Sequence, residues 1–177
     1  SAVDAATSES SKIHATLISI EANISLDRRS DAALEIEKIK DKISEQEPHL
    51  IEDFVEVCLN LALGELKIEN RGTATRLMKM AYDAGTNLKD DRTNELTMTF
   101  IKGAVKSGDI SVTKAAVDEV IKLHGGQYRK LLKPVIEAVE IVETGDTKRY
   151  YSIQIEEREI VADIVRKITG SDELCML

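Results

Sequence analysis

Four breaks in a helical hydrophobic pattern constrain the fold of this 177-residue chain more than any other feature. Apolar residues recur at helical spacing from Ser11 onward. The pattern is interrupted in four short polar stretches, LDRRSD, ENRGT, KSGD and ETGD. The helices before these breaks end near Leu26, Glu69, Ser107 and Thr144, so successive ends lie 43, 38 and 37 residues apart. A near-constant period of this length is typical of stacked helical hairpins, because a single hairpin cannot bury its apolar faces alone.

The composition favours helices over strands. Only two prolines and nine glycines occur, aromatic residues make up 3%, and tryptophan is absent. β-Sandwiches and barrels use more aromatic and turn residues, whereas this chain is rich in Ala, Leu, Glu and Lys, which are good helix formers. We therefore predict an all-α fold of about eight antiparallel helices as stacked hairpins. A compact helical bundle is the alternative architecture.

The helical pattern defines the expected domain. We predict a single helical domain over residues 11–170, a mobile N-terminal tail at residues 1–10 and a flexible C-terminal tail at residues 171–177. The segment RYYSIQIE, residues 149–156, alternates apolar and polar residues as a strand does. We favour helix there, because helical spacing continues beyond it and no partner strand is recognisable. Pro134 predicts a bend in its helix or a late helix start.

The hairpin pattern resembles the tetratricopeptide family. The turn and length of KSGDISVTKAAVDEVIKL, residues 106–123, are similar to those of the family's hairpin. Thr113 and Val120 depart from the small residues of the family, and the family's proline after each hairpin is missing. The preceding unit does carry small residues at family spacing, namely Ala62, Ala74 and Ala81. The resemblance implies an α-solenoid whose first helices line a groove for a partner segment.

Two residues are candidates for that groove. Asn60 is the only uncharged polar residue in CLNLAL. Under the resemblance it faces the groove and grips a peptide, with Lys102 of the next unit as its neighbour. The alternative is a buried Asn60 that hydrogen-bonds a nearby backbone carbonyl, because a buried amide needs partners.

Basic residues recur at the predicted hairpin turns. If the units stack in register, these residues form a row, the basic edge, which suits an acidic partner segment or a nucleic-acid backbone. The alternative is a set of solvated turn residues, some of which interact with the carboxyl end of the preceding helix. The basic edge comprises Arg28, Arg29, Arg71, Lys106, Lys148 and Arg149.

Catalytic and cofactor motifs are not recognisable in the sequence. The three histidines lie in different units, and none stands in an E-x-x-H arrangement with a glutamate. We therefore expect neither a metal nor a cofactor. Cys58 lies in an apolar run without a basic residue within one helical turn, so we interpret it as a core residue and not a nucleophile.

Charge and hydropathy bear on partners and location. The net charge of −8 disfavours nucleic acid, and no apolar stretch has the length of a membrane span. Two cysteines and no recognisable export signal favour a cytoplasmic protein.

We expect a protein-interaction module, an adaptor or scaffold, in preference to an enzyme. The alternatives are a regulatory or enzymatic bundle with a small-molecule site, and a homodimer formed through the apolar third helix and the C-terminal CML.

Overall fold

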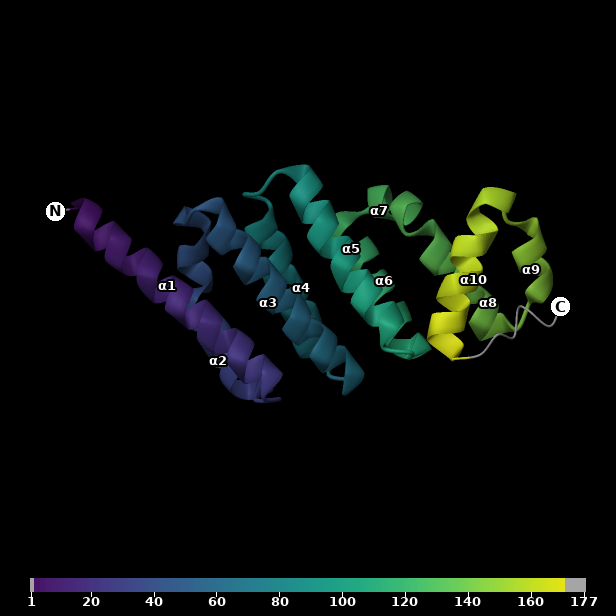
Figure 1. Ribbon diagram of the computed structural model, residues 1–177, viewed down its shortest axis with the longest axis horizontal. Coiled ribbons are helices and arrows are strands. Elements are labelled where there is room, and N and C mark those ends of the chain that lie inside the picture. Colours follow the sequence, from purple (N-terminus) through teal and green to yellow (C-terminus); the bar gives the residue numbers. More distant parts are fainter. Residues whose placement is uncertain (1, 171–177) are drawn as a thin grey trace. The chain divides into compact units, whose positions relative to one another are not determined.

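A computed structural model describes the backbone of residues 2–170, and side chains from Glu9 onward with the exception of Asp90. No strand occurs within residues 2–170, which confirms the all-α fold. The elements, labelled in Figure 1, are α1 (Ala2–Ser25), α2 (Arg29–Ile39), the 3-10 helix η1 (Lys40–Glu45), α3 (Pro48–Lys67), α4 (Arg71–Gly85), α5 (Asp90–Lys106), α6 (Ile110–His124), α7 (Gly126–Leu131), α8 (Lys133–Thr144), α9 (Thr147–Ser152) and α10 (Ile155–Thr169).

All four predicted breaks fall between helices, and each contains one residue with a left-handed backbone. These residues are Asp27, Glu69, Gly108 and Gly145, with φ values of 58°, 61°, 69° and 66°. A left-handed residue after the last helical turn is a common way to end an α-helix. In the last two breaks the next residue is an aspartate, and the side chains of Asp109 and Asp146 accept backbone N–H bonds from the helix that follows. Local chemistry at each break therefore ends one helix and starts the next.

Three segments differ in detail from the expected helices. Helix α1 begins at Ala2, so the backbone is helical in part of the predicted N-terminal tail. The last expected helix is divided into α9 and α10 by Ile153, which has extended backbone angles. The guanidinium of Arg158 holds this corner, because it donates to the carbonyl oxygens of Ile153 at 3.0 Å and Tyr151 at 2.6 Å. Helix α8 begins at Lys133, with Pro134 in its first turn, which confirms the predicted late start.

The chain divides into two compact units, residues 1–97 and 98–177, and α5 contributes to both. Each unit is described by itself. The single domain over residues 11–170 and the stacked-hairpin solenoid therefore stay predictions. None of the helices in the described part of the chain combines the length and the apolar character that a membrane span needs.

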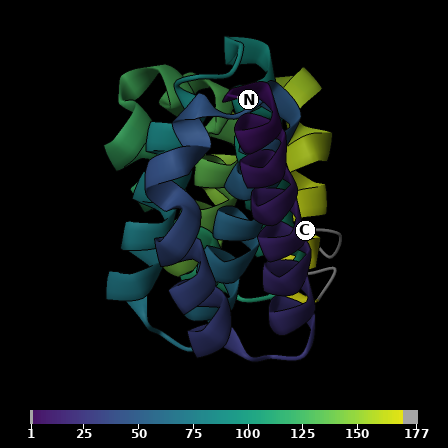
Figure 2. The ribbon, with the colours of Figure 1, turned by 90° about the vertical axis from the view of Figure 1, so that its left-hand side faces the viewer.

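The first unit is built from two helical hairpins. Figure 2 shows α1 and α2 as an antiparallel pair joined by a short turn. Helix α3 packs against α1, α2 and α4, and its contact with α4 is extensive. Ala62 on α3 and Ala74 on α4 are fully buried, which agrees with small residues that permit close approach of two helices. The largest side chains of this core include Ile13, Leu17, Ile20, Ile36, Phe54, Leu61 and Leu77.

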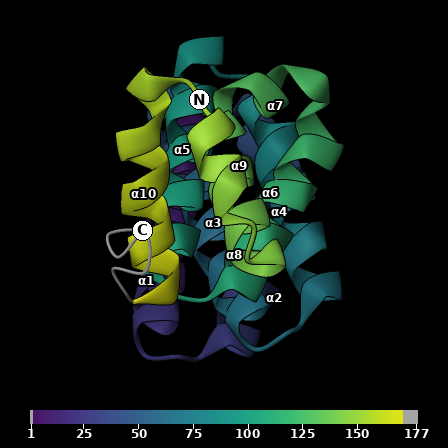
Figure 3. The same ribbon diagram turned by 90° about the vertical axis from the view of Figure 1, so that its right-hand side faces the viewer.

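The second unit is organised around α6 and α8. Helix α6 packs against α7, α8 and α10, and α8 also contacts α9 and α10 (Figure 3). Its core is mostly aliphatic and includes Ile101, Val112, Val120, Leu132 and Val161. Thr113 on α6 is also completely buried, although it is polar.

Candidate functional site

The two predicted groove residues are both exposed. Asn60 lies on the solvent side of α3, so the alternative of a buried amide that orders the core is wrong. Lys102 is exposed on α5. Asn60 belongs to the first unit and Lys102 to the second, so their proximity stays a prediction.

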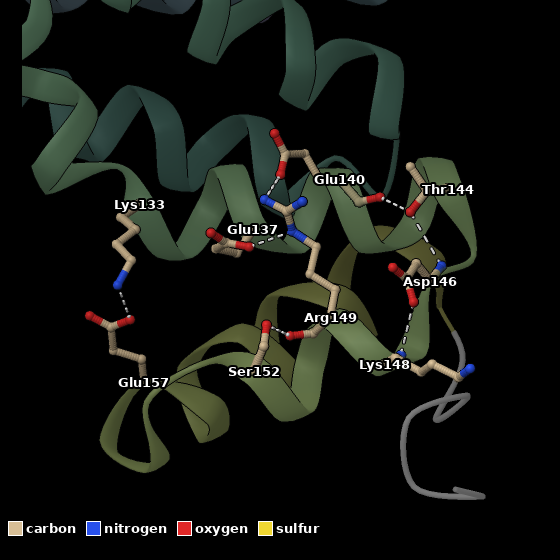
Figure 4. Close-up of polar contacts among 9 residues, drawn as sticks. All are labelled: Lys133, Glu137, Glu140, Thr144, Asp146, Lys148, Arg149, Ser152 and Glu157. Atoms are coloured by element: carbon tan, nitrogen blue, oxygen red, sulfur yellow. Dashed lines mark hydrogen bonds and ion pairs between the residues drawn. The ribbon is translucent and has the colours of Figure 1, made fainter.

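Two residues of the basic edge are engaged within their own units. Arg29 Nε lies 2.7 Å from Asp27 Oδ1, and its Nη1 donates to the backbone oxygen of Gly64 at 3.3 Å. Arg149 forms ion pairs with Glu137, at 2.7 Å, and with Glu140 (Figure 4). These contacts hold the α1–α2 turn against the end of α3, and α9 against α8. The pKa of both guanidinium groups is raised, chiefly by their hydrogen bonds to Asp27 and Glu137.

The other four residues of the basic edge present their charge to solvent. They are exposed, and none forms an ion pair with another residue that the structure describes. Within the first unit, the turn that carries Arg28 and the turn that carries Arg71 lie at the same end, because Arg29 and Asn70 line one groove. The four are Arg28, Arg71, Lys106 and Lys148.

That groove, the α2–α4 groove, is the candidate site. Ala33, Leu34 and Glu37 of α2 form one wall, and Thr73 and Arg76 of α4 form the other. Leu34 is 62% exposed, the same fraction as Leu26, and no described leucine is more exposed. An exposed leucine on a convex surface needs no explanation, but this one lines a hollow between two helices.

Charged groups surround Leu34 in a defined arrangement. Glu37 lies 2.7 Å from Lys40 Nζ and 3.6 Å from Arg76 Nη1. Glu65, at the end of α3, is 6% exposed and accepts a hydrogen bond of 2.5 Å from the side-chain amide of Asn70. The carboxylates of the α2–α4 groove therefore have partners within the first unit, while the Arg76 side chain is 57% exposed.

The sequence contains one signal for this groove that the helical pattern did not use. In the sequence of α2 and of the 3-10 helix η1 after it, Ala33, Ile36, Ile39 and Ile43 recur at helical spacing. Leu34 is an additional large apolar residue outside that set. The structure buries Ala32, Ile36 and Ile39 and leaves Leu34 in solvent.

A second hollow lies between α6 and α8, and an ion pair spans it. Val117 and Ile121 of α6 and Val139 of α8 line it. Lys114 Nζ reaches across from α6 to Glu143 of α8, at 2.6 Å from Oε1 and 2.9 Å from Oε2. An ion pair therefore joins the two walls of this second hollow.

Groups that commonly carry catalysis are dispersed. No cluster of three or more His, Cys, Asp or Glu with the geometry of a metal site occurs among the described residues. Cys58 is fully buried, and desolvation, with the negative charge of Glu37, raises the pKa of its thiol. His124 stacks on Tyr128 with ring centroids 4.3 Å apart, and burial lowers its pKa. The segment CML and Cys175, predicted to contribute to a homodimer, lie outside the described residues.

Comparison with known proteins adds no relative. No protein-family model matches the chain, and no curated protein or solved structure matches it either.

Proposed function

We propose that this protein is an interaction module, an adaptor or scaffold, whose α2–α4 groove binds a short segment of a partner protein. The exposure of Leu34 in a hollow with an arginine on the facing helix carries the proposal. Burial of a leucine side chain is worth roughly 1.5–3 kcal/mol. A partner side chain that enters the groove removes Leu34 and Ala33 from water together.

The charges of the groove favour an acidic segment. Glu37 and Glu65 have partners already, whereas Arg71 beside the groove has no ion pair with a described residue. The Arg76–Glu37 ion pair is long, and its arginine is exposed; surface pairs contribute about 0–1 kcal/mol. Arg76 can therefore turn to a partner carboxylate at little cost, and arginine binds carboxylates in a two-point geometry. The partner segment then combines an aliphatic side chain with a nearby Asp or Glu.

Selection from a phage library of random dodecapeptides tests this proposal. We expect enrichment of peptides with an aliphatic residue close to a carboxylate. A synthetic copy of an enriched peptide should bind Leu34→Glu and Arg76→Glu at least about tenfold more weakly, a difference of about 1.4 kcal/mol. Ile155→Glu is the matched control, since Ile155 is exposed in the second unit, and it should bind like the wild type.

Two outcomes contradict the proposal. One is the absence of enriched peptides. The other is an enriched peptide that binds Leu34→Glu as tightly as the wild type. In that case a loss of binding in the Asn60→Ala, Lys102→Ala double variant would move the site to the faces of α3 and α5. Circular dichroism and thermal midpoints establish that every variant is folded before binding is compared.

A further inference from the structure

From Glu9 onward, one face of helix α1 is packed and the opposite face is exposed. Ile13, Leu17 and Ile20 are buried, on the side where α1 contacts α2 and α3. On the other side Ile18 is 54% exposed, and Leu26 follows just beyond the helix. The exposed positions recur at intervals of three and four residues, so they form one continuous stripe along the helix. They include Ser11, His14, Ala15, Ile18, Glu21, Ala22 and Ser25, and we call them the α1 seam.

We infer that the α1 seam binds the α1 seam of a second copy of this chain, with the two helices antiparallel and Ile18 at the two-fold axis. This surface is separate from the α2–α4 groove, and the inference does not depend on the proposed function. In such an isologous contact the same patch serves both subunits. Ile18 then meets Ile18 of the partner subunit.

The residues on either side of Ile18 are complementary to themselves in this arrangement. An antiparallel pair places Ala15 opposite Ala22 of the partner subunit on one flank of the seam. On the other flank it places His14 opposite Glu21 of the partner subunit. Each contact occurs twice by symmetry. The small residues permit close approach of the backbones, and each polar pair joins a hydrogen-bond donor, the imidazole of His14, to a carboxylate.

The charges also exclude the competing orientation. A parallel pair centred on Ile18 places Glu21 against Glu21 of the partner subunit. Like charges in direct opposition are unfavourable and select against such a register. The order of residues along α1 therefore specifies the antiparallel dimer. One helix face is smaller than a standard interface of about 800 Å² per partner, so we expect a dissociation constant in the high micromolar range.

Cross-linking tests the position of the two-fold axis. In a Cys175→Ser background the remaining native thiol is the buried Cys58. With Ile18→Cys added, a short bismaleimide should link two chains efficiently, because residue 18 meets itself. Asn60→Cys, which is exposed on α3, is the control and should give little dimer. Equal cross-linking at the two positions would indicate random collision and overturn the inference.

Sedimentation equilibrium at high micromolar concentration tests the reversible dimer. We expect the wild type to dimerise and Ile18→Glu to be monomeric. His14→Glu should weaken dimerisation about tenfold, because it faces Glu21 of the partner subunit. The double variant His14→Glu, Glu21→Lys restores an opposite-charge pair and should recover most of the loss. A monomeric wild type, or an Ile18→Glu variant that dimerises like the wild type, would overturn the inference.

Discussion

The hydroxyl of Thr113 on α6 lies 3.2 Å from the backbone oxygen of Ala104 on α5 and 2.9 Å from that of Asp109. Thr113 is completely buried, so both acceptors satisfy a polar group that water cannot reach. The resemblance to tetratricopeptide hairpins places a small residue at this position. Threonine fits here because its hydroxyl finds acceptors on the neighbouring helix and at the start of its own.

Thr113→Val should destabilise the protein by about 1 kcal/mol, because the change keeps the shape of the side chain and removes its hydrogen bonds. Urea unfolding followed by circular dichroism measures this difference. The control is Thr16→Val, because the Thr16 hydroxyl makes an exposed hydrogen bond of 2.9 Å to the backbone oxygen of Lys12 on the same helix. We expect a change within about 0.5 kcal/mol for the control. An equal loss of unfolding free energy in the two variants would contradict the expectation that the buried hydrogen bonds of Thr113 matter more than the exposed one of Thr16.

Asp109 is the N-cap residue of α6, and its contribution to stability depends on pH. Its Oδ1 accepts hydrogen bonds from the side chain of Ser111 at 2.7 Å and from the backbone N–H groups of Ser111 and Val112. These bonds, chiefly the one from the Ser111 hydroxyl, lower the pKa of the carboxyl group. Because the pKa is lower in the folded than in the unfolded protein, the hydrogen bonds to Asp109 stabilise the fold fully above the unfolded-state pKa near 4. This stabilisation is lost as the pH falls through the folded-state pKa.

Asp109→Ala should therefore cost about 1 kcal/mol near pH 7, a typical value for loss of an N-cap. The difference from the wild type should be smaller at about pH 2 than near pH 7, because the wild-type carboxyl takes up protons as the pH falls. Asp109→Asn retains the cap without titration and should stay close to the wild type near neutral pH. Unfolding in urea at both pH values measures the effect, and an equal cost of Asp109→Ala at both would contradict it.

Replacement of glycine by alanine should have opposite effects on the stability of the protein at Gly108 and at Gly72. Gly108 has a φ of 69° in the α5–α6 turn, where a Cβ atom is unfavourable, so Gly108→Ala should destabilise by about 1–2 kcal/mol. Gly72 lies in the first turn of α4, and a Cβ atom there meets nothing within 4 Å. Gly72→Ala should stabilise by about 0.4–1 kcal/mol, because alanine restricts the unfolded chain. Thermal midpoints measure both, and shifts of the same sign would contradict the backbone argument.

Cys58 should be unreactive in the folded protein. Its thiol is fully buried, and its raised pKa disfavours the nucleophilic thiolate. In the Cys175→Ser variant we expect no release of thionitrobenzoate from Ellman's reagent under native conditions near pH 8. One thiol should react after unfolding in guanidinium chloride. Rapid reaction of the folded protein would instead indicate an accessible cysteine and reopen a catalytic interpretation.

The sequence by itself predicted the all-α fold and the four hairpin breaks. Gly108 and Asp109 show why: a left-handed glycine ends one helix, and the next residue caps the following one. Both effects involve atoms a few residues apart, so they are visible in a short stretch of sequence. The division between α9 and α10 was not predicted, because it depends on Arg158 reaching back to the carbonyl of Ile153.

The candidate site was decided by the tertiary structure. The sequence pointed to Asn60, Lys102 and the basic edge, and the structure shows that Arg29 and Arg149 are held in ion pairs within their own units. It also leaves Leu34 exposed in a groove, whereas Ala32 and Ile36 on the same helix are buried. A helix carries the same apolar residues whether or not a neighbour covers them. Local rules fix where a helix begins and ends, but exposure depends on packing between helices that are distant in the sequence.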